Sequence, residues 1–100
     1  MALVEQNLAR FERYAPNEAM VARLRDALAA GRRLTGADAS FYLHEVAEGT
    51  FRTRGVVYDM AHALALEKYG ASPFGLYHPE VIRVFPKEFS YAWREFWGLR

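Results

Sequence analysis

The chain has no cysteine, so disulfide bonds, thiolate metal sites and a cysteine nucleophile are all excluded. Any metal ion would need histidine, aspartate, glutamate or water as ligands. No apolar run approaches the roughly 18 residues that a membrane-spanning helix needs, and the N-terminus lacks a secretory pattern. Positive and negative residues also nearly balance, so the chain has little excess charge of either sign. The formal net charge is +1, so the chain offers no strong field to phosphate backbones or acidic membranes.

Apolar and aromatic residues are what the chain does have. Hydrophobic residues make up 52% of it, with seven phenylalanines, six tyrosines and two tryptophans. This composition is typical of a packed globule, and a chain of 100 residues has room for one domain with one modest core. Because the stability of such a domain is small, each polar group placed inside it has a noticeable cost.

Apolar residues recur at helical spacing along the chain, and no segment shows the alternation of a half-buried strand over a useful length. The pattern predicts an all-α fold, a single small domain of five to six short helices. Residues 1–33 are expected to form a leading helical hairpin, and residues 34–100 to carry the polar site on the remaining helices.

Prolines, glycines and capping residues set the expected limits of the first three helices. Pro16 is expected to stop the first helix and Asn17 to cap the second, which ends at Gly31. The third opens with a capping box at residues 35–38 and ends at Gly55. Its predicted buried face comprises Ala39, Tyr42, Leu43, Val46 and Ala47.

The second half of the chain predicts three further helical segments. A fourth helix is expected over residues 57–69 and a turn over residues 72–75. A short helix follows, with His78 at its N-cap and Pro79 at its first position. The last helix has an aromatic stripe that we interpret as core, and that comprises Phe89, Trp93, Phe96 and Trp97.

A second stripe of the third helix is polar, because residues three and four apart share a helix face. It comprises Phe41, His44, Glu45 and Glu48. His44 and Glu48 are four residues apart, close enough for the carboxylate to orient the imidazole. On the fourth helix, Asp59 and His62 are three apart, which predicts a second pair of the same kind.

Imidazoles oriented by carboxylates suit general acid/base catalysis, since histidine titrates near neutrality. The same groups can hold a divalent metal, with His44, Glu48 and His62 as candidate ligands. The motif is H-E-x-x-E, however, so it lacks the second histidine of the zinc-protease helix. A structural alternative stays open, in which the pairs are solvated ion pairs worth about 0.3–0.5 kcal/mol each.

Three patches resemble a known family when they are taken together. HExxE at 44–48, YDxAH at 58–62 and SPFxxYHPEV at 72–81 resemble the C-terminal toxin modules of bacterial polymorphic toxins, the variable tips of Rhs-repeat and filamentous-haemagglutinin type proteins. The resemblance covers residues 34–86. Gly49 departs from it, since a helix former is expected there, and a local kink is predicted. The first 30 or so residues match no such pattern, and are either scaffold or binding surface.

The resemblance implies a toxin effector domain that is secreted as part of a larger carrier, acts in the target-cell cytoplasm and is neutralised by a cognate immunity protein. Such tips are most often nucleases. The catalytic residues that it implies are His44, Glu45, Glu48, Asp59, His62 and His78. The candidate substrate-binding residues are Tyr58, Tyr77 and Arg54.

Three hypotheses for the function follow. The first is an interbacterial toxin that cleaves RNA or DNA with a His/carboxylate site. The second is a non-enzymatic helical interaction module whose His/carboxylate pairs are surface ion pairs. The third is a metal-dependent hydrolase of peptides or small molecules. Metal content, substrate and the effect of histidine substitutions separate them.

Overall fold

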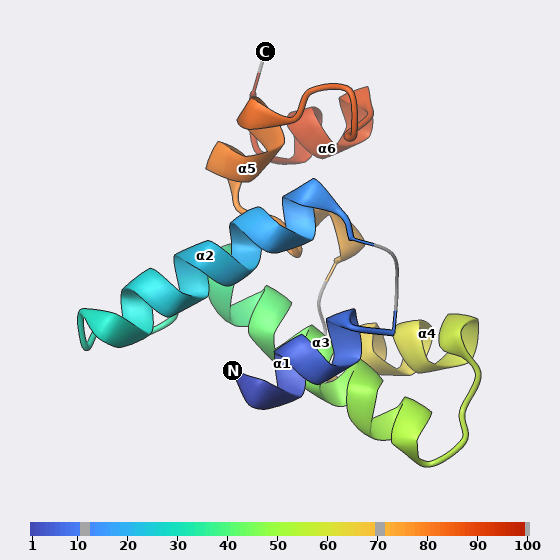
Figure 1. The fold of residues 1–100 in the computed structure, drawn as a ribbon. Helices are drawn as coiled ribbons and strands as arrows, with labels where there is room; N and C mark the ends of the chain where they lie inside the picture. The colour runs from blue at the N-terminus through green and yellow to red at the C-terminus, as the bar shows by residue number, and fades with distance from the viewer. Residues whose placement is uncertain (11–12, 70–71, 100) are drawn as a thin grey trace.

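The computed structural model describes residues 1–10, 13–69 and 72–99. Over these ranges all regular structure is helical, which confirms the predicted all-α class (Figure 1). The α-helices are α1 (Ala2–Leu8), α2 (Ala15–Ala29), α3 (Gly36–Thr53), α4 (Tyr58–Tyr69), α5 (Pro79–Val84) and α6 (Tyr91–Phe96), and a 3-10 turn, η1, covers Pro73–Gly75.

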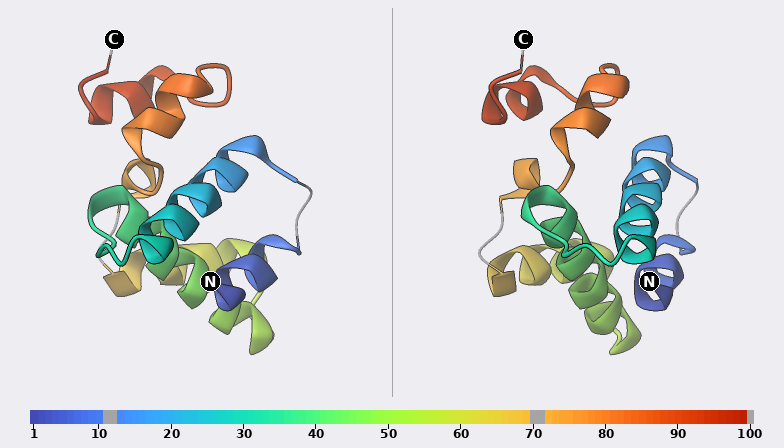
Figure 2. Two further views of the ribbon diagram at one scale, coloured as in Figure 1. Left: turned by 60° about the vertical axis from the view of Figure 1, so that its left-hand side comes forward. Right: turned by 90° about the vertical axis from the view of Figure 1, so that its left-hand side faces the viewer.

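Helix α3 is the longest, with 18 residues, and the other elements are arranged around it. Helices α1 and α4 pack along α3, and α2 also contacts it (Figures 1 and 2). The short helices α5 and α6 form a pair at the C-terminal end, where α5 contacts α2 and α6 contacts η1. Residues from both ends of the chain can therefore reach α3 and its surroundings.

The start of α2 differs from the prediction. Its N-cap is Tyr14, and Pro16 lies in its first turn rather than at the end of α1, which stops at Leu8. Proline is tolerated there because the first N–H groups of a helix have no acceptor within it. Asn17 is therefore inside α2 and not its cap, and its side chain accepts a hydrogen bond from the Tyr77 hydroxyl.

The limits of α3 were predicted more closely than its capping. Gly31, with φ 68°, follows the end of α2 as expected, and Thr35 is the N-cap of α3. The predicted capping box is nevertheless absent, because the Thr35 side chain makes no cap hydrogen bond. Asp38 instead accepts two hydrogen bonds from the Arg23 guanidinium, at 2.9 and 3.1 Å. This ion pair joins α2 to the first turn of α3.

The C-terminal elements follow the predicted order. Helix α4 begins at Tyr58, one residue later than expected. His78 is the N-cap of α5, and its Nδ1 accepts a hydrogen bond from the Glu80 N–H at 3.1 Å. Helix α6 is shorter than the predicted stripe, and Phe89 precedes it. Phe89 is still part of the core, with Trp93 and Trp97 packed against it.

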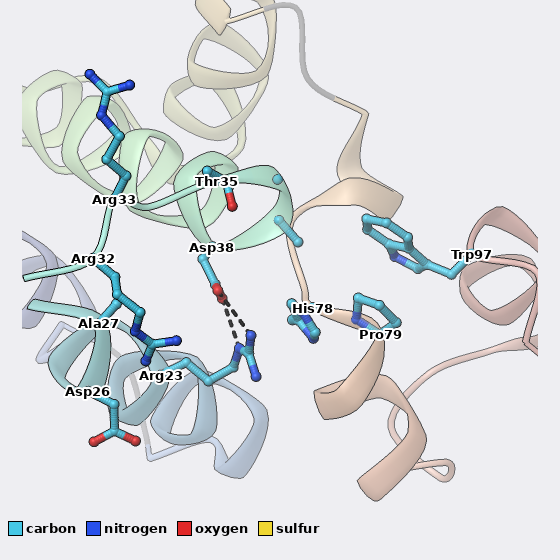
Figure 3. A pocket seen from close by; sticks show the side chains of 12 residues that line it. Arg23, Asp26, Ala27, Arg32, Arg33, Thr35, Asp38, His78, Pro79 and Trp97 are labelled. Atoms are coloured by element: carbon cyan, nitrogen blue, oxygen red, sulfur yellow. Dashed lines mark hydrogen bonds and ion pairs between the residues drawn. The ribbon is translucent and has the colours of Figure 1, made fainter. Parts of the chain in front are cut away.

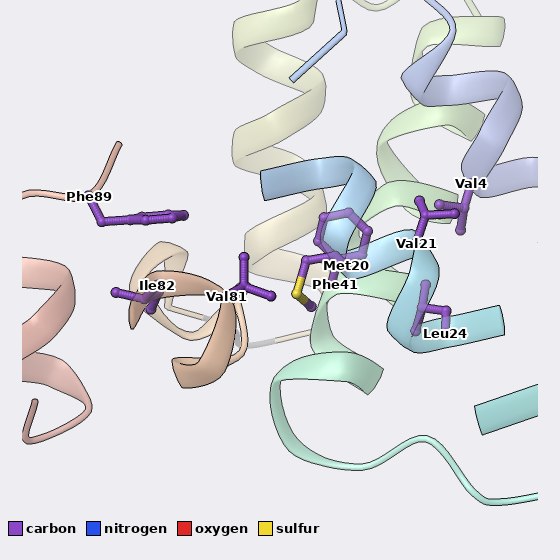
Figure 4. Close-up of a cluster of buried hydrophobic side chains, with 8 residues drawn as sticks. All are labelled: Val4, Met20, Val21, Leu24, Phe41, Val81, Ile82 and Phe89. Atoms are coloured by element: carbon purple, nitrogen blue, oxygen red, sulfur yellow. The ribbon is translucent and has the colours of Figure 1, made fainter. Parts of the chain in front are cut away.

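The core joins the central helices to the C-terminal pair. Its members include Met20 of α2 and Phe41 of α3 together with Ile82 of α5 (Figure 4). Its buried members are Val4, Met20, Val21, Leu24, Phe41, Val81, Ile82 and Phe89.

The predicted buried face of α3 is wrong in part. Leu43 is 37% exposed, and of the five predicted residues Ala47 alone is fully buried. The buried stripe is the polar one, which contains His44, Glu45 and Glu48. Helices α1 and α4 pack against α3 and bring polar partners to this stripe. Gly49 allows α1 to approach, because a Cβ at this position would lie 3.2 Å from the Cβ of Asn7.

Two leucines of α2 test how far the core supports the fold. Leu24 is fully buried and Leu28 is 50% exposed. We expect Leu24→Ala to lower the free energy of unfolding by about 2–5 kcal/mol, because it leaves a cavity in the core. Leu28→Ala, the matched control on the same helix, should change it by less than about 0.5 kcal/mol. Urea denaturation of both variants measures the difference, and equal effects would contradict this core.

Candidate functional site

The side chains that form the candidate site come from two helices that lie against each other. His44 and Glu48 are one turn apart on α3, and His62 lies on α4. Glu48 is 2% exposed and His44 is 3% exposed, whereas His62 is partly exposed. These helices therefore place a carboxylate and an imidazole in the interior, and a second imidazole at its edge.

Three atoms of these residues form a compact triangle. Glu48 Oε2 lies 2.9 Å from His44 Nε2 and 3.1 Å from His62 Nδ1. The two ring nitrogens are 3.0 Å apart. We call these three atoms the three-atom centre. The two histidine rings meet edge to face, with centroids 4.5 Å apart.

Hydrogen bonds cannot satisfy all three contacts of this centre at once. An ionised carboxylate oxygen only accepts, so each contact with Glu48 needs a proton on the histidine nitrogen. The contact between His44 and His62 needs a proton on one nitrogen and a lone pair on the other. Protons can therefore satisfy two of the three contacts. A cation placed between the atoms would accept a lone pair from each, so the centre has the donor arrangement of a metal site.

A third helix contributes Asn7, which the sequence analysis did not identify. Its side-chain Nδ2 donates to Glu45 Oε2 and, at 3.2 Å, to Glu48 Oε1. Asn7 lies three residues after the buried Val4, on the same face of α1. An amide on the apolar face of a helix was the available sequence signal, because such a group needs a buried partner.

The two glutamates of the site have opposite pKa shifts. Burial raises the pKa of Glu45 to about 7, and the negative charge of Glu48 adds to this rise against the opposing hydrogen bond from Asn7. Burial would also raise the pKa of Glu48, but hydrogen bonds from His44, His62 and Asn7 lower it to about 2. Glu48 is therefore ionised at neutral pH, whereas Glu45 exchanges its proton near neutrality.

The pKa of His62 on α4 depends on the same carboxylate, that of Glu48. The hydrogen bond from His62 to Glu48 raises the pKa of His62, although burial opposes the rise. Nδ1 of His44 is buried and has no hydrogen-bond partner among the described residues. The orientation of the His44 ring is thus set by its Nε2 contacts and by packing.

The three-atom centre opens into a cavity of about 410 Å³, which we call the central cavity. Its apolar wall includes Leu8, Phe41, Leu76, Phe89 and Trp93. Its further polar lining includes Tyr14, Asn17, Tyr58, Tyr77 and Glu88. Burial raises the pKa of Tyr77 well above its ordinary value, so its hydroxyl stays protonated. None of the described residues that line the cavity is lysine or arginine.

The other predicted site residues are not all brought to the central cavity. Tyr58 and Tyr77 line it, whereas Arg54 is the C-cap of α3 and lines a different surface hollow. Asp59 is exposed, and among the described hydrogen bonds none joins it to His62. In place of the expected Asp59–His62 pair, the structure shows a pair between helices, from His62 Nδ1 to Glu48 Oε2.

His78 lies in another cavity, of about 390 Å³, which we call the arginine cavity (Figure 3). Arg23, Arg32 and Arg33 line it together with Trp97. Figure 3 shows Arg32 extending toward Arg23 and Arg33 extending away from it. Burial and the nearby Arg23 charge lower the pKa of His78. His78 is thus a helix cap among arginines and aspartates, since Asp26 and Asp38 also line this cavity, and it does not line the central cavity.

Comparisons with known proteins found no relative. No family model matches the chain, and neither a curated protein nor a solved structure is similar enough to count as a match. The site must therefore be interpreted from its own chemistry.

Within residues 1–10, 13–69 and 72–99, none of the helices combines the length and apolar character that crossing a membrane requires.

The opposite pKa shifts of the two glutamates predict opposite pH dependences of stability. The pKa of Glu45 rises from 4.5 to about 7 on folding, so its ionisation cost is absent below about pH 4.5 and complete above about pH 7. We expect Glu45→Gln to raise the free energy of unfolding by about 2–3 kcal/mol at pH 8 and by little at pH 4. Urea denaturation with a chelator present measures both values.

Glu48→Gln is the comparison, with the opposite sign. The pKa of Glu48 falls from 4.5 to about 2 on folding, so its contribution is complete above about pH 4.5 and is lost as the pH falls toward 2. Glu48→Gln should therefore destabilise the protein at pH 7 and progressively less below pH 4.5. A pH-independent difference for either variant would contradict these assignments.

Proposed function

We propose that the chain is a metal-dependent hydrolase in which His44, Glu48 and His62 hold one divalent cation. The three-atom centre carries this proposal, since its contacts cannot all be hydrogen bonds. Ligand atoms bound to zinc at about 2.0–2.2 Å lie roughly 3.0–3.5 Å from one another. The separations of 2.9–3.1 Å in the centre are close to this range.

The donor set suits zinc and similar divalent ions. Two imidazole nitrogens and one carboxylate oxygen are a recognised set of three protein ligands for catalytic zinc, which leaves a further position for water. Glu48 is ready to bind because its low pKa keeps it ionised. The order of ligands along α3 differs from the zinc-protease helix, since Glu48 stands where that motif has its second histidine. His62 on α4 supplies the missing imidazole.

Glu45 has the position of a general base. It lines the central cavity beside the centre, where a carboxylate can take up and release a proton. The bound ion would polarise the scissile carbonyl and lower the pKa of a bound water. Glu45 would take a proton from the attacking water as its oxygen adds to the carbonyl carbon. It would return the proton to the leaving nitrogen or oxygen as that bond breaks.

The charge of the central cavity favours a neutral or cationic substrate. Three glutamates line it, Glu45, Glu48 and Glu88, and none of the described lining residues is lysine or arginine. Its aromatic wall includes Tyr77, Phe89 and Trp93, whose ring centroids lie 5.1–5.7 Å apart. A peptide, amide or ester with an apolar or basic side chain fits this lining better than a polyanion does.

A nuclease remains the second candidate, and the arginine cavity favours it. Arginine forks are suited to phosphate, and among the described interactions the side chains of Arg32 and Arg33 have no hydrogen bond or ion pair. On this proposal the chain is the toxin module that the three sequence patches suggest. It would be secreted within a larger carrier, act in the target-cell cytoplasm and bind an immunity protein. A bound metal would offset the negative charge of the central cavity.

Metal binding can be measured without knowing the substrate. We expect the protein to bind one Zn²⁺ by isothermal titration calorimetry. His44→Ala, His62→Ala and Glu48→Gln should each weaken binding by more than about a hundredfold, because a lost ligand costs more than a lost outer-shell partner. His78→Ala is the matched control, a histidine outside the central cavity, and should leave the affinity unchanged. Equal losses in all four variants would contradict the assigned ligands.

A substrate panel then separates the candidate functions. The zinc-loaded protein would be incubated with peptide amides and esters that carry aromatic or basic side chains, and separately with transfer RNA, ribosomal RNA and plasmid DNA. We expect hydrolysis in the first set alone, abolished by a chelator. Glu45→Gln should reduce its rate by about 10²–10⁴ while retaining zinc.

Other outcomes of this panel are equally informative. Cleaved nucleic acid that is lost in His44→Ala and His62→Ala would support the nuclease and contradict the preference for neutral substrates. Intact substrates in both sets, from folded protein, would contradict a hydrolase and support the interaction module.

A further inference from the structure

We propose that Asn7 of α1 is a positioning residue of the three-atom centre, whose amide aims one oxygen of Glu48 at the two histidines. Because Asn7 bonds the other oxygen of Glu48, the first helix becomes part of the site rather than a scaffold beside it. This inference rests on the proposed metal site for its effect on the reaction. The geometry it describes is also present without metal.

The two oxygens of Glu48 are used separately. Oε2 contacts His44 and His62, whereas Oε1 accepts a hydrogen bond from Asn7 Nδ2 at 3.2 Å. A carboxylate held at a single oxygen can rotate about its last bond. The second bond, from a different helix, fixes the rotation and presents Oε2 to the histidine nitrogens. Hydrogen-bonded carboxylate ligands are a general feature of metal sites, where outer partners orient the inner ones.

Asn7 also restrains Glu45. Its amide has two hydrogens, and the second is donated to Glu45 Oε2. A single neutral side chain thus bridges both carboxylates of the polar stripe. Within the described chain, no other asparagine or glutamine donates to these carboxylates. The bridge fixes the distance between the proposed base and the proposed ligand.

Asn7 is buried although one of its polar atoms has no partner among the described residues. Asn7 is 1% exposed, and its Oδ1 is buried with no hydrogen-bond partner among the described residues. A buried acceptor without a donor is costly, so an aliphatic side chain would remove this particular cost. Gly49 leaves space for the amide, since a Cβ there would lie 3.2 Å from the Asn7 Cβ and 3.4 Å from its Cγ.

The principal test substitutes Asn7→Leu, which keeps the number of side-chain heavy atoms and the branch at Cγ and removes both donors. Gln6→Leu is the matched control, because Gln6 is the exposed amide next to it on α1. Binding of Zn²⁺ by calorimetry and the visible absorption spectrum of the Co²⁺-loaded protein would be compared. We expect Asn7→Leu to weaken Zn²⁺ binding by about 10–100-fold and to change the Co²⁺ spectrum. Gln6→Leu should match the wild type.

A second variant covers the case in which Asn7→Leu does not fold. Gly49→Ala retains the amide but displaces it by a few tenths of an ångström. It should shift the Co²⁺ spectrum in the same direction as Asn7→Leu and by a smaller amount. A folded Asn7→Leu whose zinc affinity is within twofold of wild type and whose Co²⁺ spectrum is unchanged would overturn the inference. If Asn7→Leu is unfolded, an unchanged Gly49→Ala would do so.

A metal-free measurement separates this inference from the proposed function. The ¹⁵N NMR signals of the His44 and His62 imidazoles report their contacts with Glu48 in the presence of a chelator. If the wild type binds neither Zn²⁺ nor Co²⁺, the proposed function fails. The positioning role of Asn7 is still supported if Asn7→Leu shifts both histidine signals and Gln6→Leu does not. Unshifted signals in a folded Asn7→Leu would overturn it.

Discussion

The fold depends on keeping one buried carboxylate satisfied. Glu48 is almost fully removed from solvent and ionised, and a buried charge is strongly unfavourable unless other groups bond to it. Its partners come from three helices, with His44 on α3, His62 on α4 and Asn7 on α1. No single helix could supply them at this distance. The packing of α1 and α4 against α3 is thus a condition for burying Glu48, and the hydrophobic core is built beside this polar cluster.

The burial of Glu48 among these donors also gives the two neighbouring glutamates, Glu45 and Glu48, different pKa values. Glu48 takes most of the available donors, so its proton is lost easily, whereas Glu45 is buried next to a negative charge and keeps its proton up to about pH 7. Pairs of titratable groups whose environments separate their pKa values often have different roles in acid/base chemistry. Here one carboxylate suits binding a cation and the other suits moving a proton. The aromatic and acidic lining of the central cavity adds a preference for the kind of molecule that can approach them.

The sequence predicted the helices better than it predicted which faces they bury. Gly31, Gly55 and His78 marked helix limits correctly because backbone conformation and capping are local properties. The buried face of α3 was misassigned, since Leu43 is apolar and Glu48 charged, and burial of Glu48 depends on helices distant in sequence. The link between His44 and Glu48 was within one turn and could be predicted. The bond from Glu48 to His62 and the contribution of Asn7 required knowledge of how three helices pack.

The lining of the central cavity has a consequence for how the molecule folds. The contacts of His44 and Glu48 with His62 span short stretches of chain, so pairing of α3 with α4 can form them early. Asn7 and Leu8 come from the first helix, whereas Glu88, Phe89 and Trp93 come from near the other terminus. Closing those longer loops costs more entropy, so we expect these contacts to form after the pairing of α3 with α4. On this order of folding, the histidines and Glu48 come together before the cavity has its walls, and a substrate can be selected only once the C-terminal segment has docked.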